Sequence, residues 1–281
     1  MIEHPNCKIN LGLYVVRRRN DGYHDLETLF IPVPLHDRLE INPSTHFSFR
    51  QTGIDVGCSP DDNITVNAFK LMRKVCGTRL PDVEIHLDKE IPFGAGLGGG
   101  SSDAAFTLRM LNDLFDLGFD KAQLKALCAK LGADSAFFID NKAAYATGIG
   151  DQLELLDSNP LDGYTILLVK PDEAVSTAEA YRGITPRNMQ NNPQGIDLRD
   201  AVKRPISEWK NLIVNDFEPN VFAHHPRLET IKRQLYDQGA LYASMSGSGA
   251  TVYGIFPSYS GIEYSLENHF EKYGNTYIYK L

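Results

Sequence analysis

The sequence predicts a fold that mixes strands with helices, because two different spacings of apolar residues occur along its 281 residues. Residues 8–15 and 83–87 alternate between apolar and polar side chains, which is the period of a β-strand. Residues 64–75 and 104–115 place apolar side chains three or four positions apart, as amphipathic helices do. The strongest break in either pattern lies at residues 157–162, and we expect a domain boundary there.

The first half of the chain carries turn and cap residues at the ends of its expected elements. Asn20-Asp21-Gly22 is typical of a tight turn, and an extended segment follows it at residues 26–33. Asp61-Asp62 can cap the helix of residues 64–75, and Gly77 can end it. The other elements expected in this half are a strand at residues 83–87 and helices at residues 104–115 and 124–131.

The second half is expected to contain both kinds of element as well. Ser176-Thr177-Ala178-Glu179 is a capping-box sequence and predicts the start of a helix. Two strands, at residues 241–245 and 251–256, flank a second glycine-rich segment, Ser246-Gly247-Ser248-Gly249. The other elements expected here are strands at residues 164–169 and 276–279 and helices at residues 209–213, 228–235 and 262–270.

Composition argues against several classes of protein. With 28 Lys and Arg against 36 Asp and Glu, the chain carries a formal net charge of -8, which repels nucleic acid and anionic membranes. No run approaches the ~20 apolar residues that span a bilayer, and the N-terminus does not resemble a signal peptide. The four cysteines are scattered without metal-binding spacing. We therefore expect a cytoplasmic protein with no nucleic-acid or membrane partner and no metal held by a cluster of side chains.

Five glycines fall within the eleven residues from Pro92 to Ser102, between an expected strand and an expected helix. Glycine lets backbone N–H groups close around an anion, and the start of a helix favours a phosphate group. The hydroxyls of Ser101 and Ser102 can add hydrogen bonds or a ligand to Mg2+. The alternative is a merely tight connection, for which two glycines would suffice. Phosphate binding is the favoured interpretation.

The form of this segment separates it from two common phosphate-binding motifs. It is not a Walker A motif, because no lysine follows its last glycine. Gly94, Gly96 and Gly99 do match G-x-G-x-x-G, but a dinucleotide-binding fold requires an acidic residue ~20 positions later, after a second parallel strand. Here that distance falls at residues 116–120, between two expected helices. A dehydrogenase is therefore only a minor alternative.

Three segments in order resemble the motifs of the GHMP kinase superfamily: Pro5–Leu11, Pro92–Ala105 and Ser244–Ala250. The resemblance implies an α+β fold of two domains, with the active site in the cleft between them. We place the N-terminal domain at residues 1–156 and the C-terminal domain at residues 157–281. The resemblance also implies an ATP-dependent kinase that uses Mg2+ and acts on a small molecule. We expect a monomer or weak homodimer.

Further segments narrow the resemblance within the superfamily: Arg18–His24, Leu131–Asp134 and Asn215–Glu218. They imply transfer of the γ-phosphoryl group of ATP to the 2-hydroxyl of a cytidine-diphosphate-linked methylerythritol, in non-mevalonate isoprenoid synthesis. Cys7 and Ser135-Ala136 depart from the usual pattern by small changes in size. The alternatives are a homoserine- or mevalonate-type kinase, which would not need Gly22-Tyr23-His24, and a nucleotide or metabolite sensor that has lost the chemistry.

Two charged residues are the expected catalytic pair. Asp134 is a candidate general base, because a carboxylate near the acceptor hydroxyl can take its proton as phosphoryl transfer proceeds. Lys8 would lie near Asp134, keep it ionised and offset charge on the phosphoryl group. From the residues alone, Asp134 could equally cap a helix, and Lys8 could be a solvated strand residue.

The resemblance assigns the remaining site residues to ATP or to the substrate. Tyr23 would stack on the cytosine ring, His24 would hydrogen-bond its edge, and Tyr181 would be the second aromatic of that clamp. The residues expected to bind ATP are Asn63 and Lys89, at the adenine, and Pro92, Phe93, Gly94, Ala95, Gly96, Leu97, Gly98, Gly99, Gly100, Ser101 and Ser102. The residues expected to bind the acceptor are Asn10, Tyr23, His24, Thr177, Tyr181, Ser246 and Gly247.

Overall fold

The computed structural model describes residues 1–187, 197–258 and 263–281. They form two compact units whose segments interleave along the chain. The first unit consists of Met1–Lys8, Pro34–Phe93 and Gly98–Lys142, and the second of Ile9–Val33, Gly94–Leu97 and Ala143–Leu281. Both contain strands and helices, so the predicted α+β composition is confirmed. The domain boundary between residues 156 and 157 stays a prediction.

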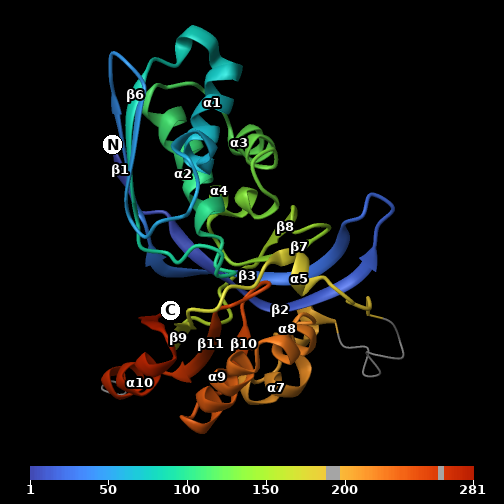
Figure 1. Ribbon diagram of the computed structural model, residues 1–281. Coiled ribbons are helices and arrows are strands. Elements are labelled where there is room, and N and C mark those ends of the chain that lie inside the picture. The colour runs from blue at the N-terminus through green and yellow to red at the C-terminus, as the bar shows by residue number, and fades with distance from the viewer. Residues whose placement is uncertain (188–196, 259–262) are drawn as a thin grey trace. The chain divides into compact units, whose positions relative to one another are not determined.

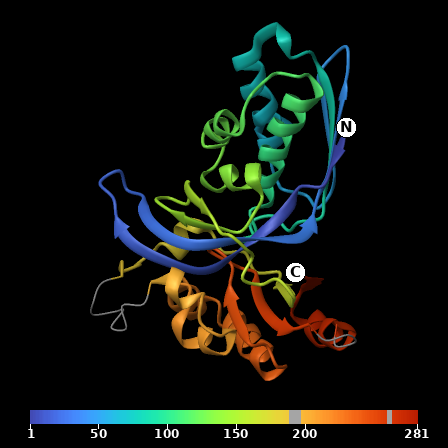
Figure 2. The same ribbon diagram turned by 180° about the vertical axis from the view of Figure 1, so that it is seen from behind.

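The first unit packs helices against one face of a four-stranded sheet (Figures 1 and 2). The strand order is β1-β4-β6-β5, in which β5 runs parallel to β6 and the other pairs are antiparallel. The strands are β1 (Ile2–Glu3), β4 (Arg38–Pro43), β5 (Ser48–Gly53) and β6 (Val83–Lys89). The helices are α1 (Ile64–Cys76), α2 (Gly99–Leu114), α3 (Lys121–Cys128) and α4 (Phe137–Asp140), with 3-10 turns η1 (Pro60–Asp62), η2 (Gly77–Arg79) and η3 (Ala133–Ala136).

Helices α1 and α2 form where the apolar spacing predicts them, and they pack on each other. The α2 side chains Ala104, Leu108 and Leu111 are fully buried, as expected for one apolar face. The predicted cap of α1 is wrong, because Asp61-Asp62 lie in the 3-10 turn that precedes the helix. Asn63 is the cap instead, and its side-chain oxygen accepts a hydrogen bond from the Thr65 amide at 2.9 Å.

The second unit is built on two four-stranded sheets. One has the order β2-β3-β7-β8 and the other β10-β11-β9-β12. The strands are β2 (Asn6–Arg18), β3 (His24–His36), β7 (Ala144–Thr147), β8 (Gln152–Leu155), β9 (Tyr164–Lys170), β10 (Tyr242–Met245), β11 (Val252–Pro257) and β12 (Asn275–Lys280). The first three residues of β2 and the last three of β3 belong to the first unit. The helices are α5 (Thr177–Ala180), α6 (Leu198–Ala201), α7 (Trp209–Leu212), α8 (Glu218–His224), α9 (Pro226–Asp237) and α10 (Glu263–Phe270), with 3-10 turns η4 (Ile206–Glu208) and η5 (Glu271–Tyr273).

Helix α9 covers β10 and β11 and closes the core of the second unit. Leu228, Ile231 and Leu235 are fully buried in a cluster that also contains Val169 and Phe256. Burial of such side chains contributes roughly 1.5–3 kcal/mol each. The predicted strands on either side of Ser246–Gly249 are therefore held in place by the apolar face of α9. Across the described ranges, no helix is long and apolar enough to cross a bilayer.

Candidate active site

The glycine-rich segment connects β6 to the N-terminus of α2, as predicted. Gly96 and Gly98 both have positive φ, at 76° and 72°. A Cβ atom on Gly98 would lie 3.0 Å from Cε of Lys8, and one on Gly96 would lie 2.0 Å from the backbone oxygen of Ser246. Neither position can hold a larger residue without rearrangement. The segment therefore places backbone without side chains at the start of a 16-residue helix, where amide groups and the helix dipole favour an anion.

Lys8 and Asp134 form an ion pair within the first unit. Nζ of Lys8, on β2, lies 3.1 Å from Oδ2 of Asp134, which lies in the turn η3. The Lys8 side chain is 4% exposed and that of Asp134 is 33% exposed, so the carboxylate remains accessible. Lys8 is not the solvated residue that was one alternative. Asp134 is not a helix cap either, because Gly132 occupies the cap position of η3. The Lys8 stem also packs under Gly98 of the glycine-rich segment.

Lys89, which was expected near adenine, is buried between two aspartates. Its ammonium pairs with Asp37 and, at 2.7 Å, with Oδ2 of Asp103. Burial acts to lower the pKa of Lys89, but the two carboxylates outweigh it and raise that pKa, so the ammonium stays charged. Oδ1 of Asp37 also accepts hydrogen bonds from the amides of Glu90 and Ile91, at 2.7 and 2.8 Å. This network anchors the chain just before the glycine-rich segment. The contact of Lys89 with adenine stays a prediction.

Asp37 is a residue that the sequence did not single out, since its partners are more than 50 positions away. Asp103 stands in the second motif, but no role was expected for it. Burial beside Asp37 raises the pKa of Asp103, and Lys89 opposes that shift. Among the residues that the structure describes, Oδ1 of Asp103 and the buried hydroxyl of Ser102 have no hydrogen-bond partner. Both atoms belong to the first turns of α2.

Asn63 lines a cavity of about 270 Å3 in the first unit. Its amide nitrogen donates to Oε1 of Gln51 at 3.0 Å, while its oxygen caps α1. The other lining residues are Phe49, Gln51, Thr52, Gly53, Asp55, Cys58 and Pro60. Ile64, the first residue of α1, lies within van der Waals contact of a Cβ built on Gly100. The cavity that contains Asn63 and the glycine-rich segment are therefore neighbours.

The tip of the glycine-rich segment, Gly94–Leu97, belongs to the second unit. There the Ser246 hydroxyl donates to the backbone oxygen of Gly96 at 2.8 Å and accepts from the amide of Asn10 at 3.2 Å. The side chain of Asn10 donates to Thr28 Oγ1 at 3.0 Å. The structure thus brings Asn10, Ser246 and the neighbouring Gly247 together with the tip of the first glycine-rich segment.

Two of the residues expected to bind the substrate contact each other. The rings of His24 and Tyr181 stack with centroids 4.8 Å apart and planes 23° apart, whereas Tyr23 is 63% exposed. Burial and the nearby Arg18 charge lower the pKa of His24, which keeps its ring neutral at pH 7. Thr177 Oγ1 lies 3.5 Å from Ser248 Oγ, at the start of helix α5. The clamp of Tyr23 and Tyr181 stays a prediction.

Two family models match the chain. One is described as the GHMP kinases N terminal domain and matches residues 63–147. The other is described as GHMP kinases C terminal and matches residues 198–269. Relatives named 4-diphosphocytidyl-2-C-methyl-D-erythritol kinase in Bacteroides thetaiotaomicron and Cytophaga hutchinsonii are 49% and 45% identical to it. Each alignment covers 91% of this chain and 92% of the relative.

Solved structures agree with the family models. A crystal structure of a 4-(cytidine 5'-diphospho)-2C-methyl-D-erythritol kinase superimposes with a TM-score of 0.81 at 31% identity, over 99% of this chain and 98% of that one. The mevalonate kinase of Methanococcus jannaschii superimposes with a TM-score of 0.75 over 99% of this chain and 96% of that one, at 13% identity, and so shares the fold. From its two matched domains and from relatives close to half identical along nine tenths of its length, this chain belongs to the GHMP kinase family.

Proposed function

We propose that the protein transfers the γ-phosphoryl group of ATP to the 2-hydroxyl of 4-diphosphocytidyl-2-C-methyl-D-erythritol, a step of non-mevalonate isoprenoid synthesis. The identity of 49% with a relative of that name supports the substrate. The observation that carries the chemistry is the ion pair of Lys8 and Asp134, packed beneath Gly98 of the glycine-rich segment. A carboxylate, a buried ammonium and a phosphate-binding backbone are the groups that this reaction needs.

Asp134 accepts the proton of the acceptor hydroxyl in this proposal. Its carboxylate is accessible enough to meet a substrate, and the ammonium of Lys8 lies 3.1 Å from it. Phosphoryl transfer has a loose transition state, so positioning of the hydroxyl and neutralisation of charge supply most of the catalysis. Lys8, whose side chain is 4% exposed, is the cation that neutralises this charge. Its burial strengthens its interaction with the phosphoryl oxygens, because little water screens it.

ATP binds through its phosphates to the glycine-rich segment and through its base to the cavity that contains Asn63. The amides at the start of α2 face the phosphates, and Asn63 and Gln51 offer amide groups to the adenine edge. Mg2+, when bound with ATP, supplies neutralisation of the phosphate charge. The buried hydroxyl of Ser102, which has no partner within the described ranges, fits an oxygen ligand to that ion.

The cytidine end of the acceptor binds at the aromatic residues of the second unit. His24 and Tyr181 already stack on each other, and the exposed ring of Tyr23 is available to a ligand. A neutral His24 can donate from one ring nitrogen and accept at the other, which suits the edge of a cytosine ring. Asn10, Thr177, Ser246 and Gly247 line the path of the acceptor. We further propose that the protein acts in the cytoplasm, as a monomer or weak homodimer.

Phosphorylation of competing acceptors tests the proposal. Purified protein is incubated with ATP and Mg2+ plus the cytidine substrate, homoserine or mevalonate, and ADP release and the phosphorus NMR spectrum of the product are followed. We expect rapid turnover with the cytidine substrate alone and a new phosphomonoester signal. Rapid phosphorylation of homoserine or mevalonate in its place would refute the specificity. Nucleotide binding without turnover of any acceptor would instead indicate a nucleotide or metabolite sensor that has lost the chemistry.

A further inference from the structure

Asn215-Asp216-Phe217-Glu218 is a motif of the second unit for which the reaction has no evident use. It follows α7 and runs into α8, whose first residue is Glu218. None of its side chains is expected to touch ATP or the acceptor. Asn215 and Glu218 are nevertheless buried, at 2% and 7% exposure. Burying polar groups costs free energy unless they are hydrogen-bonded, so their partners indicate what they hold in place.

The side chain of Asn215 holds the backbone of the second glycine-rich segment from one side. Its Nδ2 donates to the backbone oxygens of Met245 and Gly247, both at 2.8 Å. The Met245 carbonyl belongs to the peptide unit that leads into Ser246, and the Gly247 carbonyl to the unit that leads from Gly247 into Ser248. The two hydrogen bonds therefore fix the backbone on both sides of Ser246. The Asn215 oxygen accepts from the Phe217 amide at 3.0 Å, which fixes which face of the side-chain amide points at the segment.

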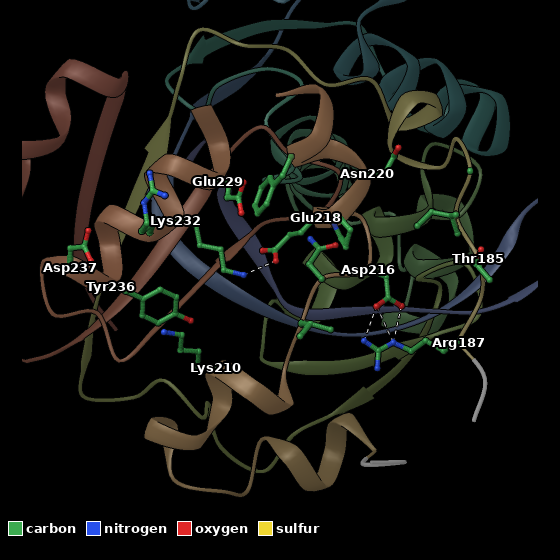
Figure 3. A pocket seen from close by; sticks show the side chains of 17 residues that line it. Thr185, Arg187, Lys210, Asp216, Glu218, Asn220, Glu229, Lys232, Tyr236 and Asp237 are labelled. Atoms are coloured by element: carbon green, nitrogen blue, oxygen red, sulfur yellow. Dashed lines mark hydrogen bonds and ion pairs between the residues drawn. The ribbon is translucent and has the colours of Figure 1, made fainter. Parts of the chain in front are cut away.

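Glu218 holds the same backbone at the point where β10 ends. Its Oε1 accepts from the Met245 amide at 2.8 Å and from the Ser244 hydroxyl at 3.0 Å. Its Oε2 accepts from Lys232 Nζ at 2.6 Å. Figure 3 shows this ion pair in the wall of a cavity of about 780 Å3, where Lys232 reaches Glu218 from α9. The ion-paired carboxylate of Glu218, with both oxygens hydrogen-bonded, is thus fixed beside the backbone of Met245.

Asp216 anchors the motif itself to β2. It accepts from the Val15 amide at 2.9 Å. Both of its oxygens also accept hydrogen bonds from Arg187, as Figure 3 shows. The backbone of residue 216 donates to the oxygen of Leu13 at 2.9 Å. The position of Asn215 and Glu218 is therefore set by the sheet, independently of the segment they hold.

Ser246 transmits this placement to the phosphate-binding tip. Its hydroxyl donates to the oxygen of Gly96, and the two backbones approach so closely that no Cβ atom fits on Gly96. We propose that Asn215 and Glu218 are positioning residues for ATP: they hold residues 245–247 so that Ser246 fixes Gly94–Leu97 in its phosphate-binding conformation. This inference rests on the proposed kinase activity, whereas its test measures nucleotide binding alone.

The first test replaces Asn215 by aspartate, which keeps the shape and turns the Nδ2 donor into an acceptor facing two carbonyls. We expect the Kd for a non-hydrolysable ATP analogue, measured by calorimetry, to rise ~10-fold or more, and kcat to fall up to ~100-fold, as displaced positioning groups cause. Glu229→Gln is the matched control, an exposed acid in the wall of the same cavity (Figure 3), and we expect its Kd to stay native.

A second comparison separates positioning from mere stability. Glu218→Gln combined with Lys232→Met removes both charges but keeps an oxygen for the Met245 amide, so we expect near-native nucleotide affinity. Glu218→Ala loses that oxygen, and we expect weak binding even at a temperature where circular dichroism shows it folded. If Asn215→Asp does not fold, this pair decides.

A double-mutant cycle completes the test. Asn215→Asp and Ser246→Ala act through one chain of contacts in this proposal, so their effects on Kd should be clearly less than additive. Folded Asn215→Asp and Glu218→Ala proteins that bind the analogue as the native chain does would overturn the inference. A native chain that binds no ATP analogue would instead refute the proposed function.

Discussion

Asp134→Asn is the substitution that bears most directly on the chemistry. It keeps the size of the side chain while removing the charge 3.1 Å from Lys8 Nζ and the ability to accept a proton. At an effective dielectric constant of about 20, the lost attraction is about 5 kcal/mol before solvation is considered. Asp134 is one third exposed, so water offsets most of that, and we expect a net loss of only about 1 kcal/mol of stability. The fold should survive, with Tm lower by ~2–4 °C.

The effect on turnover should be far larger than the effect on stability. Loss of a general base lowers kcat by ~100- to 10,000-fold, which corresponds to ~3–5 kcal/mol of transition-state stabilisation. Binding of the cytidine substrate should be largely retained, because the change removes a contact used in the transition state. The assay is ADP release at saturating ATP and acceptor, with Kd values for both ligands measured separately.

Asp140 offers a matched control for Asp134. It pairs with two lysines, Lys121 at 3.0 Å and Lys125, and lies in the next helix of the same unit. Both neighbours hold its pKa below the ordinary range against the effect of burial. Asp140→Asn should therefore lower Tm while leaving kcat within about twofold of native, well below the ~100-fold expected for loss of a general base. A near-normal kcat for Asp134→Asn would remove that residue from the mechanism.

Three further predictions concern the binding segments and the buried ion pairs. Gly98→Ala should abolish nucleotide binding, since its Cβ meets Lys8 at 3.0 Å, whereas Gly118→Ala, also at positive φ but in open space, should bind ATP normally by calorimetry. Lys89→Met leaves two buried carboxylates without their cation, and we expect a loss of ~3–5 kcal/mol and a Tm lower by about 10 °C; an unchanged Tm would contradict it. The pKa of His24 is lowered in the folded protein. The stability contributed by neutral His24 is therefore fully present above its ordinary pKa of ~6.5 and is lost as the pH falls through the folded pKa. His24→Gln should accordingly show a smaller drop in Tm between pH 7 and pH 5 than the native protein does.

Local patterns predicted the elements that depend on local forces. The alternation along residues 8–15 became part of β2, and the spacing of Leu228, Ile231 and Leu235 became the buried face of α9. The cap of α1 was missed by one residue, because Asp61, Asp62 and Asn63 are all good cap residues. Only the geometry of the preceding 3-10 turn selects Asn63 among them.

Lys8 and Asp134, the expected catalytic pair, owe their prediction to the family resemblance and not to local patterns. Lys8 and Asp134 are 126 positions apart, and no periodicity relates them; the resemblance to kinase motifs predicted their proximity, and the structure confirms it. The same resemblance placed Lys89 at adenine but could not indicate its burial between Asp37 and Asp103. A motif identifies a residue, whereas the side chains that contact this residue come from segments outside the motif.

By itself, the sequence predicted a phosphate-binding backbone along Pro92–Ser102, because the segment holds five glycines where a tight connection would need only two. The tertiary structure alone decided which polar groups meet: Asp37 with Lys89, and Asn215 and Glu218 with the backbone of residues 245–247. The physical reason is that periodicity and capping arise from neighbours along the chain. Contacts between distant buried polar groups exist only after strands and helices have packed and water has been removed.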